Sequence, residues 1–259
     1  SSDPSHAGYV LEALKAGKFV FCEKPLAQNA EDCEKIIAAE TAHGRRLLQV
    51  GFMRRYDRGY AEMKRIIDSG ELGAPLMIHA CHRNVSQPDG FQTEMGVSNV
   101  AIHELDICRW LLGDEYEGAQ VLKVRQSACS TKGYDNPQIV LLETKSGARI
   151  DVEVQVADAY GYDIQCQVVC EKGTVNLPDP YAVVKRANAS RSFPILTDWK
   201  DRFIEAYDIE LTHWVKTLEE KGEPDGPSAW DGYAACVAAD ALNRSRGTGR
   251  FLPVETMEK

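Results

Sequence analysis

The sequence predicts an α/β segment followed by an α+β domain, which has an open, mainly antiparallel sheet and flanking helices. Two observations support this prediction. The first fifty residues alternate helical apolar patterns with short, wholly apolar strands, as doubly wound parallel sheets do. Later segments alternate apolar with polar side chains, which is typical of an antiparallel sheet with one face on a core. We therefore expect residues 1–50 to be the C-terminal remnant of a Rossmann-type, dinucleotide-binding domain and residues 51–259 to form a second domain.

The first part has local signals for its element ends, since Gly17 and Gly44 each close a helical pattern. A complete dinucleotide-binding domain opens with a strand, the pattern G-x-G-x-x-G and a helix. The printed sequence has no such pattern, so we expect either a fragment or a chain that lacks that half of the domain. The predicted elements are a helix at 6–16, a strand at 18–22, a helix at 29–43 and a strand at 46–52.

The second part changes style after Phe52. Its clearest strand contains Ile150, Val152 and Val154, whose neighbours in the sequence are polar, so one face is expected on a core. Gly70 and Gly113 end two helical patterns. The predicted helices are 57–69, 98–112, 198–221 and 228–246, and the predicted strands are 75–84, 119–126, 138–144, 148–157, 162–170 and 173–177.

Composition excludes several classes of protein. The chain has 259 residues, is 44% hydrophobic and 27% charged, and carries a formal net charge of -9, which disfavours a nucleic-acid partner. No apolar run approaches the ~20 residues of a membrane span, and the first residues lack signal-peptide order, so we expect a cytoplasmic protein without a membrane partner. The eight cysteines form no Cys-x-x-Cys pair and are expected to be reduced. His79, Cys81 and His82 do not share one strand face, so no metal site is expected.

The predicted helix at 98–112 is almost wholly apolar except for one polar line. Asn99, His103 and Asp106 stand at i, i+4 and i+7, on one face. A helix this apolar is buried, and buried polar groups need partners. One interpretation is a core histidine paired with a neighbour, and the other is a functional site that needs a second group elsewhere in the chain.

Glu23, Lys24 and Pro25 provide such a second group. They follow a buried parallel strand at its carboxyl end, where α/β folds bind ligands. A charged pair beside proline is also an ordinary helix-start signal. A lysine near a reacting hydroxyl can stabilise developing negative charge and lower the pKa of a neighbouring acid.

With this Glu-Lys-Pro followed about eighty residues later by a His-x-x-Asp helix, the chain resembles the glucose-fructose oxidoreductase/inositol dehydrogenase family. The likeness spans essentially the whole chain. Glu-Lys-Pro marks the family, whereas other segments are more specific to its bacterial inositol dehydrogenases. The segments that carry the likeness are CEKPLA (22–27), VGFMRRYD (50–57), PLMIHACHRN (75–84), HELDICRWL (103–111), DNPQIV (135–140), YGYDIQC (160–166) and AWDGY (229–233).

The resemblance implies roles for particular residues. Lys24 matches the lysine that bridges nicotinamide ribose and substrate, Glu23 and Pro25 lie beside it in the cofactor cleft, and the bond before Pro25 is usually cis. His103 matches the general base that takes the hydroxyl proton. The residues matched to the substrate pocket are His82, Asn84, Asp106 and Tyr162, with Met53 and Arg54 at its border.

The residue types agree with a polyol ligand, which needs mixed donors and acceptors. His82 and Asn84, at i and i+2, share one strand face. Tyr162 shares the apolar face of its strand, so a core role remains open for it. Asp106 could also serve only to hold His103 or to cap a backbone group.

Asn99 departs from the family pattern, which places an aspartate four residues before the histidine. An aspartate there would pair with Lys24 and favour the imidazolium of His103. Asparagine keeps the hydrogen bonds and loses the charge. We therefore count Asn99 among the catalytic residues, expect its side chain to reach both Lys24 and His103, and expect Asn99→Asp to raise turnover.

The resemblance implies an NAD-dependent enzyme that oxidises myo-inositol at carbon 2 to the ketone. scyllo-Inositol and a pyranose are the alternative substrates. A non-catalytic binding module is the alternative of another class, because the glycine pattern is absent and position 99 is asparagine. Family members form tetramers through the sheet, so a homotetramer is expected, with Arg149, Asp151, Glu153 and Gln155 on the outward face.

Overall fold

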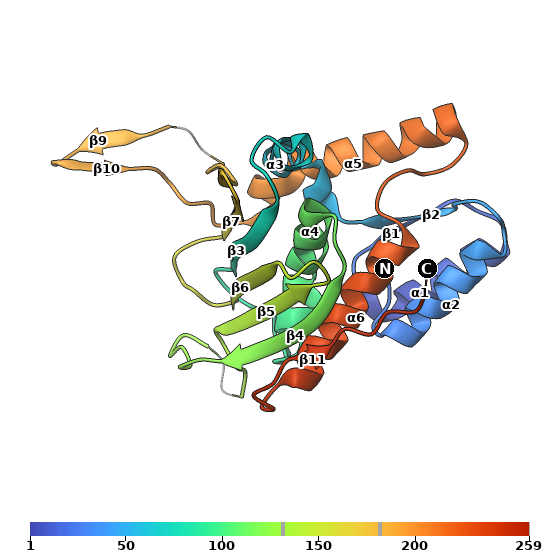
Figure 1. Cartoon of the computed structure of the whole chain (residues 1–259), viewed down its shortest axis with the longest axis horizontal. Helices are drawn as coiled ribbons and strands as arrows, with labels where there is room; N and C mark the ends of the chain where they lie inside the picture. Colours follow the sequence, from blue (N-terminus) through green and yellow to red (C-terminus); the bar gives the residue numbers. More distant parts are fainter. Residues whose placement is uncertain (131–132, 181–182, 259) are drawn as a thin grey trace.

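The computed structural model describes residues 1–130, 133–180 and 183–258. Its first part is a parallel pair of strands, β1 (Val20–Glu23) and β2 (Leu48–Gly51), with two helices packed together beside them (Figure 1). The helices are α1 (His6–Lys15) and α2 (Ala30–Thr41), and a short 3-10 turn, η1 (Asp3–Ser5), precedes α1. Asn29 caps α2 by accepting a hydrogen bond from the Asp32 N–H. This is the α/β pattern that the sequence predicts.

The second part is built on a seven-stranded sheet within the described residues, in the order β11-β4-β5-β6-β3-β7-β8. All its neighbouring strands are antiparallel except β3 and β6, which run parallel. The predicted open, mainly antiparallel sheet is therefore confirmed. Its strands are β3 (Pro75–Arg83), β4 (Tyr116–Lys123), β5 (Gln138–Thr144), β6 (Arg149–Gln155), β7 (Asp163–Cys170), β8 (Gly173–Asn176) and β11 (Leu252–Pro253).

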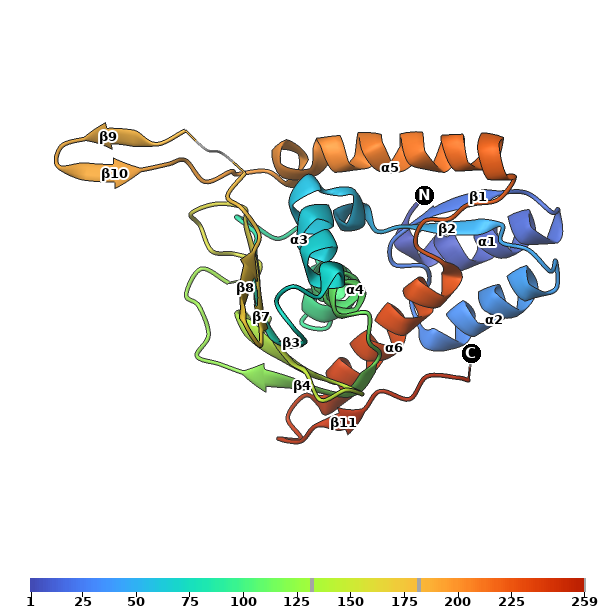
Figure 2. The same cartoon turned by 45° about the horizontal axis from the view of Figure 1, so that its top comes forward.

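One face of this sheet carries the core, and the other is open (Figure 2). The buried face of β6 consists of Ile150, Val152 and Val154, which are at most 2% exposed, and it is covered from the helix side. On the opposite face His79 pairs with Asp151, and Arg83 pairs with Glu153 at 2.7 Å. The alternation read from the sequence thus separates a dry face from a polar one.

The helices connect the two parts. α3 (Arg58–Ser69) follows a 3-10 turn, η2 (Met53–Tyr56), and α4 (Ile102–Leu112) packs against β3. α5 (Trp199–Lys221) extends from beside α3 to above β1 and β2 (Figure 2), where Trp214 meets Phe21 edge-on. α6 (Ala229–Ser245) packs against α2, α4 and β4. Together they hold the end of β1 close to the sheet.

The sequence prediction of one regular helix over 98–112 is wrong at its start. A π-helical turn, η3 (Gly96–Ala101), comes first, and α4 begins only at Ile102. A π-turn inserts an extra residue per turn, so Asn99 does not continue the line of His103 and Asp106. Such bulges are common at functional sites.

Besides the two-residue β11, two short strands were not predicted: β9 (Lys185–Ala187) and β10 (Ser190–Ser192). They form an antiparallel hairpin that projects from the body of the molecule, and every residue in them is exposed (Figures 1 and 2). Their sequences lack the apolar alternation by which the other strands are found. No helix in the described part of the chain is long and apolar enough to cross a membrane.

Candidate active site

A cavity of about 560 Å³ lies between the end of β1, the end of β3, the π-turn and the start of α5. The sequence analysis predicted site residues that are far apart in the chain, and seven of them line this cavity together. They are Lys24, Met53, His82, Asn84, Asn99, His103 and Tyr162. Arg54, Asp106, Glu23 and Pro25 do not line it.

Lys24 enters the cavity directly after β1, and the Lys24–Pro25 peptide bond is cis, as the resemblance implies. Its Nζ donates a hydrogen bond of 3.0 Å to the main-chain carbonyl of Asn99. Burial lowers the pKa of Lys24, while the charges of Asp3 and Glu23 favour the ammonium. The structure therefore places at the cavity an ammonium group whose pKa is lowered by burial and partly restored by two carboxylates.

His103, on α4, lines the same cavity as Lys24 and is only 9% exposed. Its Nδ1 has no hydrogen-bond partner among the described residues. Burial lowers the pKa of His103 well below its usual value, and the charges of Lys24 and Arg54 act in the same direction. The imidazole is therefore neutral at pH 7 and able to accept a proton.

His82 is oriented from behind by a residue that the sequence analysis missed. Its Nδ1 lies 2.9 Å from Oε2 of Glu104, which is 1% exposed and also forms an ion pair with Arg54. The same Nδ1 lies 3.1 Å from a guanidinium nitrogen of Arg54, which can only donate. We assign the proton to Nδ1, toward the nearer Glu104 carboxylate, which can only accept. Burial lowers the pKa of His82, so its Nε2 is left as an acceptor. The signal in the sequence was a charged residue, Glu104, directly beside His103 in a helix that is mostly apolar.

Arg54 borders this arrangement without lining the cavity. It is 1% exposed, its guanidinium stacks over the Phe203 ring at 5.3 Å, and it pairs with Glu104. Although burial alone would raise the pKa of Glu104, Arg54 and His82 hold it below the usual value. Arg54 thus keeps Glu104 ionised, and it also contacts His82 directly, with one guanidinium nitrogen 3.1 Å from His82 Nδ1.

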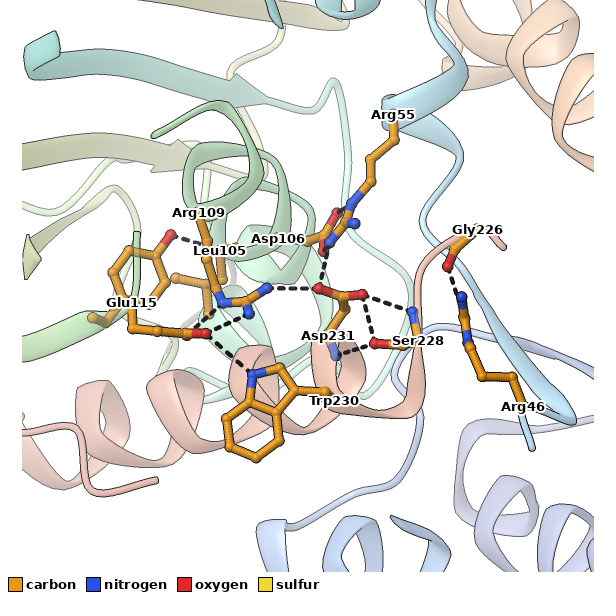
Figure 3. A network of polar contacts seen from close by, with 11 residues as sticks. Arg46, Arg55, Leu105, Asp106, Arg109, Glu115, Gly226, Ser228, Trp230 and Asp231 are labelled. Carbon is orange, nitrogen blue, oxygen red and sulfur yellow. Dashed lines mark hydrogen bonds and ion pairs between the residues drawn. The ribbon is translucent and has the colours of Figure 1, made fainter. Parts of the chain in front are cut away.

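Asp106 is turned away from the cavity, contrary to the expectation that it contacts the substrate. It is 1% exposed and forms an ion pair with Arg55, another residue that the sequence analysis missed (Figure 3). Arg55 also pairs with Asp231 at 2.9 Å, and Asp231 joins Arg109 at 2.6 Å. These ion pairs connect η2, α4 and the N-terminus of α6, so Asp106 fixes the helix that carries His103.

The Asn99 side chain also differs from expectation. Its Nδ2 donates a hydrogen bond of 2.7 Å to Oδ2 of Asp3, and only its main-chain carbonyl receives Lys24. The π-turn explains this, because the side chain is rotated toward η1 and the carbonyl toward the end of β1. Asp3 was not recognised in the sequence, and no local pattern marks it.

The remaining lining is mixed. Asn84 is half-buried, and its Oδ1 has no partner in the part of the chain that the structure describes. Tyr162 is 9% exposed and meets the rings of His82 and Phe203 edge-on, so it belongs to both the cavity wall and the core. Trp199 and Tyr207, from α5, add an aromatic side that the sequence analysis did not predict.

Glu23 and Pro25 lie at the back of Lys24. The Glu23 carboxylate lies against Gly51, where a Cβ would come within 3.0 Å of it. The Pro25 carbonyl accepts a hydrogen bond of 2.8 Å from Nδ1 of buried His6. Pro25 also lines a second cavity, of about 450 Å³, with Asp3 and Asn99. Across the described ranges, no group of three or more His, Cys, Asp or Glu side chains is placed to hold a metal ion.

A Rossmann-type strand that delivers a lysine to a cavity lined by a neutral histidine is typical of nucleotide-dependent oxidoreductases. Residues 1–52 match "Oxidoreductase family, NAD-binding Rossmann fold", and residues 64–256 match "Oxidoreductase family, C-terminal alpha/beta domain". The chain belongs to this family, the glucose-fructose oxidoreductase/inositol dehydrogenase family.

Curated relatives agree over nearly the whole chain. An inositol 2-dehydrogenase of Burkholderia cenocepacia is 53% identical over 256 residues, which cover 99% of this chain and 76% of the relative. One of Klebsiella pneumoniae is 54% identical over 255 residues, covering 98% and 75%. The crystal structure of a Lactobacillus casei myo-inositol dehydrogenase in complex with NAD(H) and myo-inositol superposes with a TM-score of 0.96, at 38% identity, covering all of this chain and 77% of that one.

Proposed function

We propose that this chain belongs to an NAD-dependent inositol 2-dehydrogenase and carries the substrate site and the acid–base groups of the reaction. The observation that supports this best is the pairing of neutral His103 with Lys24 across one polar cavity. Oxidation of a carbinol needs a base for the hydroxyl proton and a cation for the oxygen. The relatives of similar sequence are inositol 2-dehydrogenases, which makes myo-inositol, oxidised at carbon 2, the proposed substrate.

In this proposal His103 takes the hydroxyl proton as general base, and Lys24 stabilises the developing alkoxide. NAD, when bound, supplies the hydride acceptor. The residues present fit its nicotinamide end, because Lys24 and Pro25 follow β1 at the edge where parallel sheets bind nucleotides. His103 Nδ1, buried and without a partner among the described residues, fits a ligand hydroxyl in the same cavity.

The cyclitol ring is proposed to lie against β3 and the aromatic side. His82 Nε2 would accept from one hydroxyl, and Asn84 Oδ1 from another. Tyr162 would contact the ring by its edge, and Met53 would cover an apolar C–H face. Mixed polar and aromatic lining is typical of sites for polyhydroxylated rings.

The test is a substrate panel, assayed in a protein that carries this sequence together with a complete NAD-binding half. We expect myo-inositol to give the highest kcat/KM among myo-inositol, scyllo-inositol and hexoses, with reduction of NAD. Faster turnover of scyllo-inositol or a pyranose would move the proposal to those alternatives. Loss of all oxidation, with inositol still bound, would favour a non-catalytic binding module.

We also propose a homotetramer in the cytoplasm. The sheet is covered on one face only, and its outward pairs, His79–Asp151 and Arg83–Glu153, suit a polar contact with another sheet. All eight cysteines are free thiols, which is usual in a reducing compartment. We further propose that residues 1–50 and 51–259 are the two domains. Light scattering at micromolar concentration tests the assembly, and a monomeric mass would reject it.

A further inference from the structure

Asn99 connects two charged groups that do not touch each other directly. Its Nδ2 donates to Oδ2 of Asp3 at 2.7 Å, and its carbonyl oxygen accepts from Nζ of Lys24 at 3.0 Å. Asp3 belongs to η1, Lys24 follows β1, and Asn99 lies in the π-turn before α4. Three separate elements therefore meet at one amide residue, at the edge of the 560 Å³ cavity.

Lys24 needs negative charge in its surroundings, since burial disfavours an ammonium. The charged groups that face it are Asp3 from η1, Glu23 from β1, Arg54 from η2 and Glu104 from α4. Arg54 opposes the ammonium. Glu104 is already engaged by Arg54 and by His82.

Glu23 and Asp3 are therefore the carboxylates left to favour the Lys24 ammonium. Of these two carboxylates, Asp3 favours the charged form of Lys24 more strongly than Glu23 does. Asp3 is also the one that is coupled to Lys24 through a hydrogen-bonded residue. Charge and geometry therefore point to the same side chain.

We propose that Asp3 is a positioning residue of the catalytic site: through the Asn99 amide it fixes the carbonyl that receives Lys24, and its carboxylate keeps that lysine charged. This inference rests on the proposed function, in which Lys24 polarises the reacting oxygen. Asparagine suits position 99 because its Nδ2 donates to a carboxylate without adding a second negative charge. Asp3 and Asn99 together form one anionic unit, with the charge on the η1 side.

The experiment compares Asp3→Asn, Asn99→Asp and the double variant that carries both changes. The protein tested carries this sequence with a complete NAD-binding half. Asp3→Asn should lower kcat about 10-fold with KM for myo-inositol changed less than threefold, because the substrate contacts remain. Its alkaline limb of kcat against pH should move about one unit toward lower pH, because a nearby anion is lost.

In the double variant, the hydrogen-bonded pair of residues 3 and 99 again has one carboxylate, now at position 99. It should recover most of the lost kcat and the original alkaline limb, a result that a merely structural role of Asp3 would not produce. Asp208→Asn, on the exposed side of α5, is the matched control and should leave kcat unchanged. Thermal unfolding of each variant separates misfolding from a change in charge.

A second measurement does not depend on turnover. The Lys24 pKa is followed by NMR of 13Cε-labelled lysine, with Lys24→Met to assign the signal, and it should fall by about one unit in Asp3→Asn. An unchanged Lys24 pKa together with an unshifted pH profile would overturn the role of Asp3. Failure of the parent to oxidise any inositol would instead overturn the proposed function, and the NMR titration would still decide the pairing.

Discussion

Lys24 meets Asn99 at the main chain: its Nζ lies 3.0 Å from the Asn99 carbonyl oxygen, while the Asn99 side chain is held by Asp3. The lysine is therefore positioned by a backbone atom of a π-turn. The side chain at position 99 affects the lysine only through its hydrogen bond to Asp3, which holds that part of the backbone. This relationship changes what a substitution at position 99 should do.

Asn99→Asp is expected to give less than a threefold gain in kcat at pH 7, rather than the strong gain that the sequence suggested. The new carboxylate would stand against Asp3 Oδ2, now 2.7 Å from Asn99 Nδ2, and two such groups cannot both ionise cheaply. Steady-state kinetics with myo-inositol at pH 6 to 9 checks this. A gain of 10-fold or more at neutral pH would mean that Asp3 contributes no charge.

The pH dependence of turnover should show an acid limb below the ordinary histidine range. Burial and the charges of Lys24 and Arg54 lower the pKa of His103 well below 6.5, so the imidazole stays neutral and basic until the pH falls through that lowered value. A kcat profile between pH 4.5 and 8 tests this, and His103→Asn should lose roughly 10²- to 10⁴-fold in kcat. An acid limb at or above pH 6.5 would contradict the assignment.

Local chemistry made much of the fold predictable. Gly70 and Gly113 end α3 and α4 in the left-handed conformation, Asp57 and Asn29 cap helices, and the Gln138–Thr144 strand has the predicted bounds. These features depend on a few neighbouring residues. The parallel pairing of β3 with β6 depends on the order of strands in space, which local patterns do not encode.

The candidate site was predictable in part for the same reason. Lys24, His82 and His103 carry side chains whose chemistry is unusual in apolar surroundings, so they stand out in the sequence. Glu104 and Arg55 act through partners about fifty residues away in the chain, Arg54 and Asp106 respectively, and Asp3 acts across 96 positions. Asp106 was misplaced because its true partner, Arg55, could not be recognised before the helix was placed against η2.

Glu104→Gln should destabilise the protein by about 3–5 kcal/mol, since it leaves the buried Arg54 guanidinium without its anion. The matched control is Glu205→Gln, whose pair with Arg58 is exposed and should contribute less than about 1 kcal/mol. Urea unfolding of both variants gives the comparison. Equal losses would show that the buried pair is no more important for stability than the surface pair.

Asp106→Asn and Asn84→Ala should separate structure from substrate binding. Asp106→Asn weakens the pair with Arg55 and should lower the free energy of unfolding by about 1–3 kcal/mol, with KM for myo-inositol changed less than threefold. Asn84→Ala removes a cavity-lining amide and should raise KM about 10-fold with little loss of stability. The opposite pattern, a large KM effect from Asp106→Asn alone, would return Asp106 to the substrate contacts.

Glu210, on α5, should make the protein less stable as the pH rises. It is fully buried, neither carboxyl oxygen has a hydrogen-bond partner among the described residues, and burial raises its pKa to about 9. The folded state therefore binds a proton more tightly than the unfolded state, whose pKa is near 4.5. The full stability is present below that value and is lost as the pH rises toward 9, by about 1.4 kcal/mol for each pH unit. Glu210→Gln keeps the shape and removes the titration.

This variant should equal the parent in unfolding free energy near pH 5 and exceed it at pH 8, as measured by urea unfolding at both pH values. Glu219→Gln, an exposed change on the same helix, is the control and should leave the difference between the two pH values unaltered. If the unfolding free energy of the parent protein is the same at pH 5 and pH 8, the proposed effect of Glu210 on stability is wrong. If the parent loses stability with pH and Glu210→Gln loses it equally, another buried acid is responsible, and the paired carboxyl of Asp106 on α4 is the next to substitute.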